Sequence, residues 1–334
     1  MKKTLLKLSV LLLFTGTTLV SCSDDDNNNT QPQSSIADLA AATSDFSMLT
    51  QALNRAGLTA TLDGDGQYTV FAPTNAAFTA FLSANGYTSI DQVPVTTLKN
   101  ILLNHVVGME VKSDAIATGY VSTMSPMSAM ANSPMISMYI NKSGNTVTIN
   151  GGASNMGTTV TMADIDANNG VIHAVGNVIG IPTIVNHVVA NPDFDTLQSV
   201  VTSTSGAFGD QSGVLTALSS VTAAMPVTVF APNNAAFTTA TTGTGFAVGA
   251  TPAQVSKVLQ YHVTTAGNVR SSQLMNNQNI GMMTMPEQNV MVMLSGGNVD
   301  IKDSANNLAR VYQADIQASN GVIHGVNRVM QPQL

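Results

Sequence analysis

The chain contains one ten-residue segment twice. Residues 69–78 read TVFAPTNAAF and residues 228–237 read TVFAPNNAAF, with a single difference. A second motif, Asn-Gly-Val-Ile-His, ends at His173 and again at His324. The offset between copies is 228 − 69 = 159 residues for the first motif and 324 − 173 = 151 for the second. Because both order and spacing are kept, the sequence predicts a duplicated domain of about 150 residues rather than a solenoid of short repeats.

The duplicated segment indicates a corner between a strand and a helix. Residues 69–72 favour a strand, and Pro73 ends it because proline cannot donate to a ladder. Thr74 in the first copy and Asn233 in the second are both good N-cap residues for a helix that follows. The single difference therefore exchanges one capping residue for another, and architecture explains the segment without catalysis.

Each half begins with helical patterns and ends with strand-like ones. Asp45 is expected to cap an amphipathic helix that stops at Gly57, and Asp193 holds the matching position in the second half. Thr251 opens a capping box with Gln254, so another helix follows there. Runs of β-forming residues come later in each half. This order predicts an α+β fold with a largely antiparallel core.

The N-terminus has the features of an export signal. Two lysines precede an apolar run, residues 5–20, that is too short to span a membrane. Leu-Val-Ser-Cys then ends at Cys22, the single cysteine of the chain. This tetrad resembles a bacterial lipoprotein signal, in which the cysteine becomes the first mature residue and receives acyl chains such as palmitate. Residues 1–21 are therefore expected to be a removed signal peptide; an ordinary secretory signal is the alternative.

Residues 22–34 are expected to form a disordered polar tether, because they have too few apolar side chains to bury a core. Three consecutive aspartates follow the cysteine almost directly. Their position resembles the surface-export signal of lipoproteins in the Bacteroidetes lineage, and a solvated spacer is the alternative. The expected location is the bacterial outer membrane, with a lipid anchor on Cys22 and exposure at the cell surface.

The composition and the missing motifs limit the classes of function that are expected. Apolar residues make up 44% of the 334 residues but charged residues only 9%, so the surface must consist mostly of Thr, Ser, Asn, Gln and Gly. The net charge is −7, there is no tryptophan, and no basic stripe exists. Nucleic acid is therefore not an expected partner. The sequence lacks the common hydrolase, metalloprotease, P-loop and dinucleotide motifs, so no enzyme activity and no cofactor are expected.

The TVFAP segment, a helix that ends in a histidine and the Asn-Gly-Val-Ile-His segment together resemble the fasciclin family. The resemblance covers nearly the whole mature chain in two tandem copies, residues 35–181 and 182–334. It implies that each copy is a wedge of helices packed on a β-sandwich-like core. It also implies a role in adhesion, because family members are extracellular or membrane-anchored modules that bind proteins, matrix or cell-surface glycans, and no enzyme activity is general to them.

Some family members have a Tyr-His pair at the end of the second helix that has been linked to receptor binding. The second copy has this pair as Tyr261 and His262, whereas the first has Asn104 and His105. The resemblance therefore implies these four residues as candidate partner-binding residues. The departure at Asn104 weakens this expectation for the first copy.

Four of the five histidines occur at matching positions of the two copies, namely His105, His262, His173 and His324. Structural hydrogen bonding is the favoured interpretation, with ligand contact and metal or acid–base chemistry as alternatives. A histidine at a helix end can bond the last carbonyls, and one that ends the Asn-Gly-Val-Ile-His segment could tie its strand to that helix. His187 has no counterpart and is expected at the surface or an interface.

Methionines crowd matching segments of the two copies. Core and half-exposed packing is the favoured interpretation, an adaptable adhesive surface is the second, and a thioether site for Cu(I) is the third. The main functional hypothesis is thus a non-enzymatic adhesion protein, and the alternatives are a copper-handling or a purely structural envelope protein. The methionines are Met124, Met127, Met130, Met135 and Met138, then Met275, Met282, Met283, Met285, Met291 and Met293.

Overall fold

The computed structural model describes residues 34–242 and 250–334. Residues 1–21, Cys22 and the tether up to residue 33, with the predictions made for them, lie outside the described residues. Within the described part, no helix has the length and apolar character needed to cross a membrane. We call residues 35–181 the first repeat and residues 182–334 the second repeat, as the sequence predicts.

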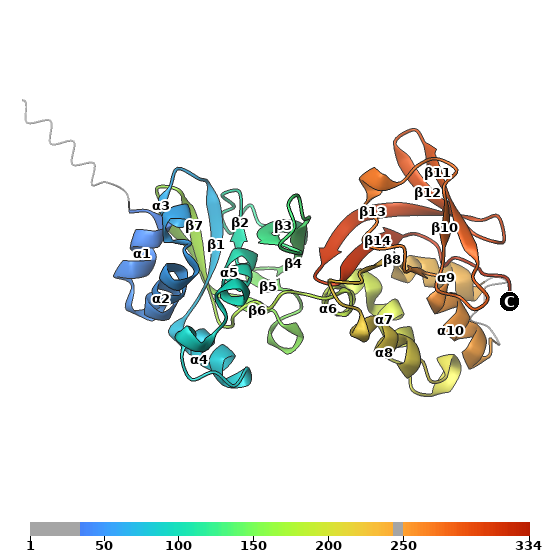
Figure 1. The fold of residues 1–334 in the computed structure, drawn as a ribbon, viewed down its shortest axis with the longest axis horizontal. Coiled ribbons are helices and arrows are strands. Elements are labelled where there is room, and N and C mark those ends of the chain that lie inside the picture. Colours follow the sequence, from blue (N-terminus) through green and yellow to red (C-terminus); the bar gives the residue numbers. More distant parts are fainter. Residues whose placement is uncertain (1–33, 243–249) are drawn as a thin grey trace, which may run out of the picture. The chain divides into compact units, whose positions relative to one another are not determined.

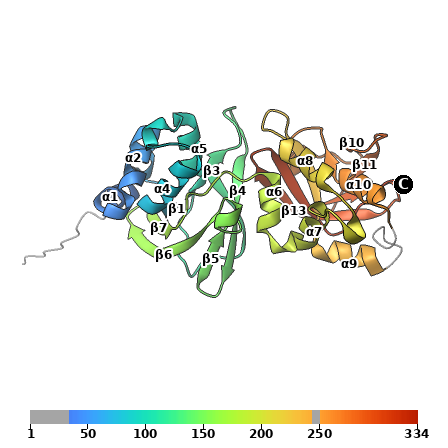
Figure 2. The ribbon, with the colours of Figure 1, turned by 90° about the horizontal axis from the view of Figure 1, so that it is seen from below.

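The first repeat combines a group of helices with a closed barrel of strands. Helices α1, α2 and α4 gather on one side of β1 and β7, and strands β3 to β5 lie on the other (Figures 1 and 2). Its helices are α1 Ile36–Ala42, α2 Ser47–Ala56, α3 Thr59–Asp63, α4 Asn75–Ala84 and α5 Val95–Asn104. Its strands are β1 Tyr68–Pro73, β2 Val106–Val107, β3 Gly119–Pro126, β4 Met135–Ser143, β5 Thr146–Ile149, β6 Thr158–Ala167 and β7 Gly170–Val175.

The second repeat has a similar order of elements around a seven-stranded sheet. Its helices are α6 Ile184–Ala190, α7 Asp195–Val201, α8 Ser212–Ser220, α9 Asn234–Thr242 and α10 Pro252–Gln260. Its strands are β8 Val227–Pro232, β9 Val263–Thr264, β10 Asn279–Gly281, β11 Asn289–Ser295, β12 Asn298–Lys302, β13 Leu308–Ala318 and β14 Gly321–Val326.

The expected α+β fold with a largely antiparallel core is confirmed in both repeats. The exception is one parallel pair in each, between the first and last long strands: β1 with β7, and β8 with β14. This pair places the two duplicated motifs side by side, because Phe71 of the first motif is the register partner of His173 of the second. In the second repeat the same position joins Phe230 and His324.

The corner in the duplicated segment is also confirmed. The strand ends at Pro73 in the first copy. The side chain of Thr74 accepts a hydrogen bond from the Ala77 amide at 3.3 Å, and Asn233 accepts one from the Ala236 amide at 2.9 Å. Either residue therefore satisfies an amide of the first helical turn that has no partner within the helix.

The next asparagine of the segment has a role that the sequence did not indicate. Asn75 accepts a hydrogen bond from the Met48 amide at 2.9 Å and donates one to the Ser44 carbonyl at 2.8 Å. It therefore caps the start of α2 from another part of the chain. The predicted N-cap at Asp45 is wrong, because Asp45 lies in a short 3-10 turn, residues 44–46, and α2 begins after it. The predicted stop at Gly57 is correct, since this glycine has a left-handed φ of 67°.

The second repeat repeats this arrangement. Asn234 accepts from the Thr196 amide at 2.9 Å and donates to the Pro192 carbonyl at 2.8 Å. Asp193 lies in a 3-10 turn, residues 192–194, so the helix start expected there is also displaced. In both repeats, an asparagine at the corner ties the helix that follows the strand to the helix that precedes it.

The asparagine of the Asn-Gly-Val-Ile-His motif forms a second tie. Asn169 is buried, accepts from the Ile36 amide at 2.9 Å and donates to the carbonyls of Leu62 at 2.8 Å and Gly64 at 2.9 Å. Asn320 accepts from the amide at the start of α6 in the same way, at 2.9 Å. The turn before the last strand is thereby fixed to the first helix of each repeat.

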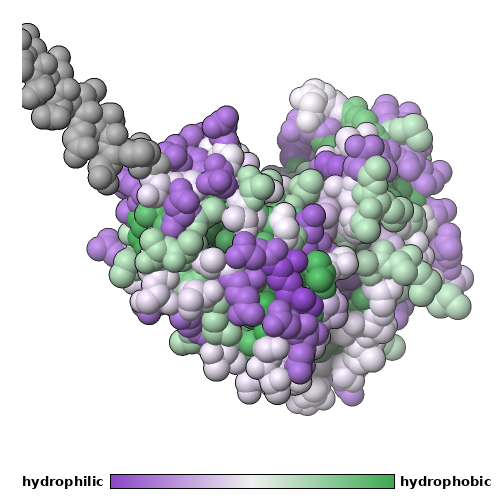
Figure 3. Space-filling view, turned by 60° about the vertical axis from the view of Figure 1, so that its left-hand side comes forward, coloured by the Kyte–Doolittle hydropathy of each residue, from purple (hydrophilic) through white to green (hydrophobic). Residues whose placement is uncertain are grey.

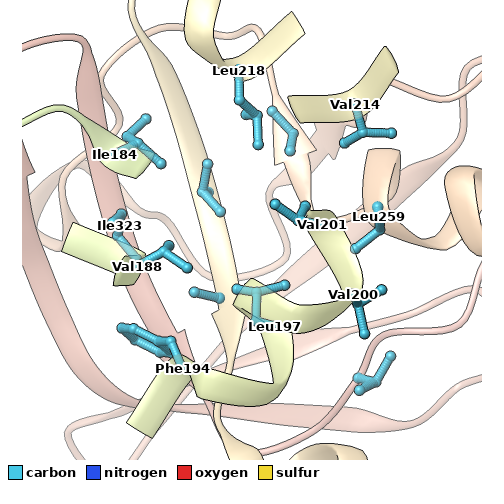
Figure 4. Close-up of a cluster of buried hydrophobic side chains, with 14 of the residues drawn as sticks. Ile184, Val188, Phe194, Leu197, Val200, Val201, Val214, Leu218, Leu259 and Ile323 are labelled. Carbon is cyan, nitrogen blue, oxygen red and sulfur yellow. The ribbon is translucent and has the colours of Figure 1, made fainter. Parts of the chain in front are cut away.

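The helical core of the second repeat contains a small unfilled space. Figure 4 shows Val201, Val214, Leu218 and Leu259, from α7, α8 and α10, around a common space. An apolar cavity of about 40 Å³ lies among these helices and β8. Counting from Phe194 and Phe46, Val201 stands where the first repeat has Leu53 (194 − 46 = 201 − 53 = 148). The smaller side chain at this position leaves unfilled volume next to it.

Removing the Asn169 tie is expected to destabilise the first repeat. Asn169→Ala leaves the buried Ile36 amide and the Leu62 carbonyl without the partner they have in the native protein, so the free energy of unfolding should fall by about 2–3 kcal/mol. Urea denaturation followed by circular dichroism measures the change. Asn100→Ala, on a helix and without this network, serves as control and should shift stability by less than about 0.5 kcal/mol. Equal effects of the two substitutions would contradict the assigned role.

Filling the cavity is expected to stabilise the second repeat. Val201→Leu adds one methylene to an apolar cavity, which should raise the free energy of unfolding by about 0.8 kcal/mol and the melting temperature by roughly 2–4 °C. Differential scanning calorimetry provides the measurement. The reciprocal Leu53→Val in the first repeat should lower stability by about 1 kcal/mol. A melting temperature that falls in Val201→Leu would show that the site cannot accept the larger side chain.

Candidate partner-binding surface

The four residues predicted to bind a partner lie inside the repeats. Asn104 and Tyr261 are completely buried, and His105 and His262 are 2% and 4% exposed. All four lie at the C-terminal ends of α5 and α10. Their side chains reach the interior of the fold rather than the surface. Contact with a partner at these residues stays a prediction, and the contacts described next are made within the chain.

His105 and His262 make identical hydrogen bonds. Each Nδ1 bonds the carbonyl four residues earlier in its helix at 2.8 Å. Each Nε2 accepts a backbone amide that follows the last strand, from Ile179 at 2.8 Å and from Met330 at 2.9 Å. An amide can only donate, so Nε2 is unprotonated and the ring is neutral. Burial lowers the pKa of both imidazoles to about 4, which keeps this tautomer at neutral pH.

The residue before each histidine differs between the repeats. The Tyr261 hydroxyl donates to the Asn289 carbonyl at 2.9 Å and accepts from the Ser304 amide at 3.0 Å. The Asn104 amide group donates to the Gly180 carbonyl at 3.0 Å, while its buried Oδ1 has no partner among the described residues. The tyrosine thus links its helix to the far strands of the sheet, and the shorter asparagine does not.

His173 and His324 tie different elements from those expected. His173 Nδ1 accepts from the Asp164 amide at 3.2 Å, and Nε2 donates to the Val111 carbonyl at 3.0 Å. His324 bonds the Asp315 amide and the Val269 carbonyl in the same way, at 3.3 Å and 2.9 Å. The expected tie from this strand to the helix end is therefore wrong for these residues. They fix the neighbouring bulged strand and the segment after β2 or β9 instead.

His187 is not at the surface. Its side chain is completely buried and its Nε2 bonds the Gln317 carbonyl at 3.2 Å. Its ring makes a T-shaped contact with the ring of Tyr120, which belongs to the first repeat, with 5.4 Å between centroids. The surface expectation is wrong, and the interface expectation describes this contact between the repeats.

The methionines divide between core and surface. Met138 and Met282 are buried among apolar side chains, as the packing interpretation expects. Others are exposed, and methionine accounts for most of the large apolar side chains that the described residues expose. Packing therefore explains only some of them. The exposed methionines are Met109, Met130, Met135, Met156, Met162, Met225, Met275 and Met285.

The face seen in Figure 3 is otherwise mixed. Apolar residues reach it in separate patches, and residues of intermediate hydropathy cover much of the area between them. This agrees with a surface built mainly from Thr, Ser and Gly. A candidate binding surface must therefore be identified from local shape and from the backbone rather than from one large apolar face.

A methionine-lined groove runs along the first repeat. It consists of two adjoining hollows of about 510 Å³ and 260 Å³ that share Val107, Met109, Tyr120 and Val121. We call it the β3 groove. The larger hollow is lined by residues 107–109 on one side and 120–124 on the other, with Met135 at its end. The lining is mostly apolar, and Met109 is more than half exposed.

The walls of the β3 groove are formed by consecutive residues. A hollow on the face of a sheet would be lined by every second residue, because side chains alternate along a strand. Residues 120–124 all line this one, so the groove follows the edge of β3. On this edge β3 pairs with β2 at a single position, Val107 with Thr123, whereas on its other edge it pairs with β4 over several residues. Within residues 34–242 and 250–334, the first part of β3 therefore has one unpaired edge.

No pattern in the sequence revealed this groove. Met109, Tyr120 and Val121 come together only because β2 is two residues long and the chain then leaves β3. Of the methionines singled out from the sequence, Met124 and Met135 line the groove. The described residues include no group of three or more His, Cys, Asp or Glu side chains that could hold a metal ion. The Cu(I) alternative, which relies on thioethers, stays a prediction.

Comparison with known proteins shows the family to which both repeats belong. The family model described as Fasciclin domain matches residues 44–182 and 193–332. Transforming growth factor-beta-induced protein ig-h3 of Sus scrofa is 32% identical over 157 residues, which are 47% of this chain but only 21% of that protein. Protein sll1483 of Synechocystis sp. is 31% identical over 144 residues, 43% of this chain and 72% of that protein.

One solved structure resembles the two repeats taken together. It is a FAS1 domain pair from the insect cell adhesion molecule fasciclin I, with 16% sequence identity and a TM-score of 0.48. The match covers 85% of this chain and 92% of that one. Since the chain matches only about a fifth of ig-h3, the remainder of that protein has no counterpart in the match.

The buried histidines predict how stability depends on pH. The unfolded chain binds protons near pH 6.5, whereas folded His105 and His262 bind them only near pH 4. Stability should therefore be highest above pH 6.5 and fall as the pH drops toward 4, by on the order of 3 kcal/mol for each imidazole. Urea midpoints between pH 7.5 and 5, where carboxylates stay ionised, measure the slope.

His262→Gln provides the control for this pH dependence. The variant should be less stable at pH 7.5, because two hydrogen bonds change, but its stability should vary less between pH 6.5 and 5. A slope equal to that of the native protein would show that His262 does not titrate in this range. A native protein with constant stability from pH 7.5 to 5 would contradict the neutral, buried state of these rings.

Proposed function

We propose that this chain, which belongs to the fasciclin domain family, is a surface adhesion protein. It binds proteins or glycans and does not transform them chemically. Fasciclin domains occur in cell adhesion proteins, and the two matches cover most of the chain. The single observation that carries the proposal for this chain is the β3 groove, where an unpaired strand edge and exposed methionines lie together.

The anchor is the second part of the proposal. The lipoprotein-like tetrad places acyl chains on Cys22, and burial of each methylene contributes about 0.8 kcal/mol to membrane binding. The polar residues that follow Cys22 would then connect the anchor to the first repeat. A protein held in this way at the outer membrane would present its repeats to the cell exterior.

The β3 groove suits an extended segment of a partner protein. Unpaired amides and carbonyls along a strand edge can add another strand, which supplies hydrogen bonds independent of sequence. Methionine side chains are flexible and polarisable, so Met109 and Met135 can adjust to different apolar side chains of that segment. A strand edge together with methionine side chains favours binding of several related segments over binding of one specific ligand.

The histidine geometry supports binding rather than catalysis. A general base needs a ring nitrogen within reach of a substrate. In the repeats, His105, His262, His173 and His324 are buried, and both ring nitrogens of each bond the backbone. The negative net charge and the lack of a basic stripe support partners other than nucleic acid.

A charged side chain in the β3 groove should weaken adhesion. Met109→Lys places a cation where an apolar partner side chain would be buried, so affinity should fall by about tenfold or more, equivalent to the 1.5–3 kcal/mol of burying one methionine. Retention of cells or protein-coated beads on matrix proteins and surface proteins measures adhesion. Met225→Lys is the matched control, because Met225 is exposed and lies outside the groove.

The outcomes of this comparison are distinct. Loss of adhesion in Met109→Lys, unchanged adhesion in Met225→Lys and equal melting temperatures would support the β3 groove as the contact surface. Equal loss in both variants would indicate a general charge effect and remove the groove from the proposal. Absence of adhesion across the panel, together with turnover of an envelope substrate, would overturn the proposed function itself.

A further inference from the structure

The two repeats differ at an ion pair. In the first repeat Lys112 Nζ lies 3.0 Å from Asp166 Oδ1, and this carboxylate raises the pKa of the lysine. In the second repeat Arg270 stands in place of Lys112 and Gln317 in place of Asp166. The cation is kept while its carboxylate is replaced by a neutral amide.

The surrounding hydrogen bonds establish this correspondence. The amide that precedes Lys112 bonds Thr69 Oγ1, and the amide that precedes Arg270 bonds Thr228 Oγ1, at 2.8 Å and 2.9 Å. The residue that follows each cation is a serine whose amide donates to an aspartate of the bulged strand, at 2.8 Å and 2.7 Å. Asp166 and Gln317 each lie two residues after that aspartate.

Gln317 makes contacts that differ from those of Asp166. Its backbone amide donates to Ser137 Oγ of the first repeat at 2.9 Å, and its side chain pairs with that of Asn268 at 3.0 Å and 3.1 Å. It is 3% exposed. Its side chain also donates to Met127 Sδ of the first repeat at 3.2 Å, so it supports the junction between the repeats and supplies no negative charge to Arg270.

Arg270 is left without a partner for its charge. Of the four arginines in the described residues, Arg55, Arg310 and Arg328 all have side-chain hydrogen bonds. Among the described residues, the Arg270 guanidinium has neither a hydrogen bond nor an ion pair. A guanidinium presents a planar fork of donors that matches a carboxylate, so an external carboxylate would restore the interaction seen in the first repeat.

Arg270 lines a cleft large enough for such a ligand. The cleft has a volume of about 390 Å³, within the usual range of small-molecule sites. Asp315 also lines it, but hydrogen bonds from the amide and hydroxyl of Ser271 hold its two oxygens. The other polar residues in the lining are Ser122, Ser133, Ser137 and Gln317.

We propose that this cleft binds an acidic saccharide, with the carboxylate of the sugar on Arg270 and its hydroxyl groups on the serine hydroxyls and Asp315. Hydroxyl-rich ligands need both donors and acceptors, and serines and a carboxylate provide them. The cleft adjoins the β3 groove, because Ser122 and Met135 line both. The inference deepens the proposed function by naming a ligand class, and it rests on that function only in treating the protein as one that binds.

Calorimetric titration of the full-length protein in detergent tests the proposal. The probes are glucuronate and a glucuronate-containing disaccharide, each compared with its neutral methyl ester. The acids should bind at least about tenfold more tightly than the esters, and the difference should shrink at high salt. Arg270→Gln should remove the preference, while Arg270→Lys, which keeps the charge but loses the fork, should retain part of it.

Lys112→Gln is the matched control, since it removes the corresponding cation that already has a partner. It should leave saccharide binding within about twofold. Equal binding of acids and esters, unchanged binding in Arg270→Gln, or equal loss in Lys112→Gln would overturn the proposal. Binding of a triglutamate peptide without binding of the saccharides would overturn it in favour of an acidic peptide. If saccharides fail to bind while Met109→Lys still reduces adhesion, this inference falls and the proposed function stands.

Discussion

Buried side chains that bond the backbone hold each repeat together. Asn169 joins the turn before the last strand to the first helix, and His105 joins the end of a later helix to the segment after that strand. These partners are 133 and 74 residues apart in sequence. Each bond satisfies a buried amide that would otherwise be costly to desolvate. The helical layer and the strands are therefore fixed to each other by a few obligatory contacts, and hydrophobic burial supplies the remaining stability.

This arrangement occupies the ring nitrogens of the duplicated histidines within the fold. A residue whose donors and acceptors are all used inside the fold has none left for a ligand, as His262 shows. Functional differences must then come from positions where the copies diverge. Asp166 and Gln317 form one such pair: the side chain of Asp166 neutralises a cation at the surface, and that of Gln317 donates to Met127 of the other repeat.

The sequence was sufficient wherever one local interaction decided the structure. Thr74, Asn233 and Gly57 act within one turn of their own helices, so their roles could be predicted from capping preferences. The prediction of Asp45 as the N-cap was wrong because the helix is capped by Asn75. This residue lies 27 positions away in sequence from the amide that it bonds. The β3 groove depends on the pairing of β2 and β3, which no residue type specifies. The exchange of Asp166 for Gln317 can be found by aligning the repeats. Only the structure shows that Arg270, which lacks the carboxylate, lines a cleft.

Duplication also allows one repeat to carry a binding feature that costs stability while the other repeat keeps the stabilising interaction. A strand edge open to a partner is an aggregation hazard, and an unpartnered arginine gives up an ion pair. The unpartnered arginine occurs in the second repeat, while the first repeat keeps the corresponding cation paired at Lys112. Because exposed ion pairs contribute little to stability, the exchange of Asp166 for Gln317 changes the chemistry of the surface far more than it changes the fold. A chain with only 9% charged residues can therefore gain a charged recognition site by removing one carboxylate rather than by adding a cation.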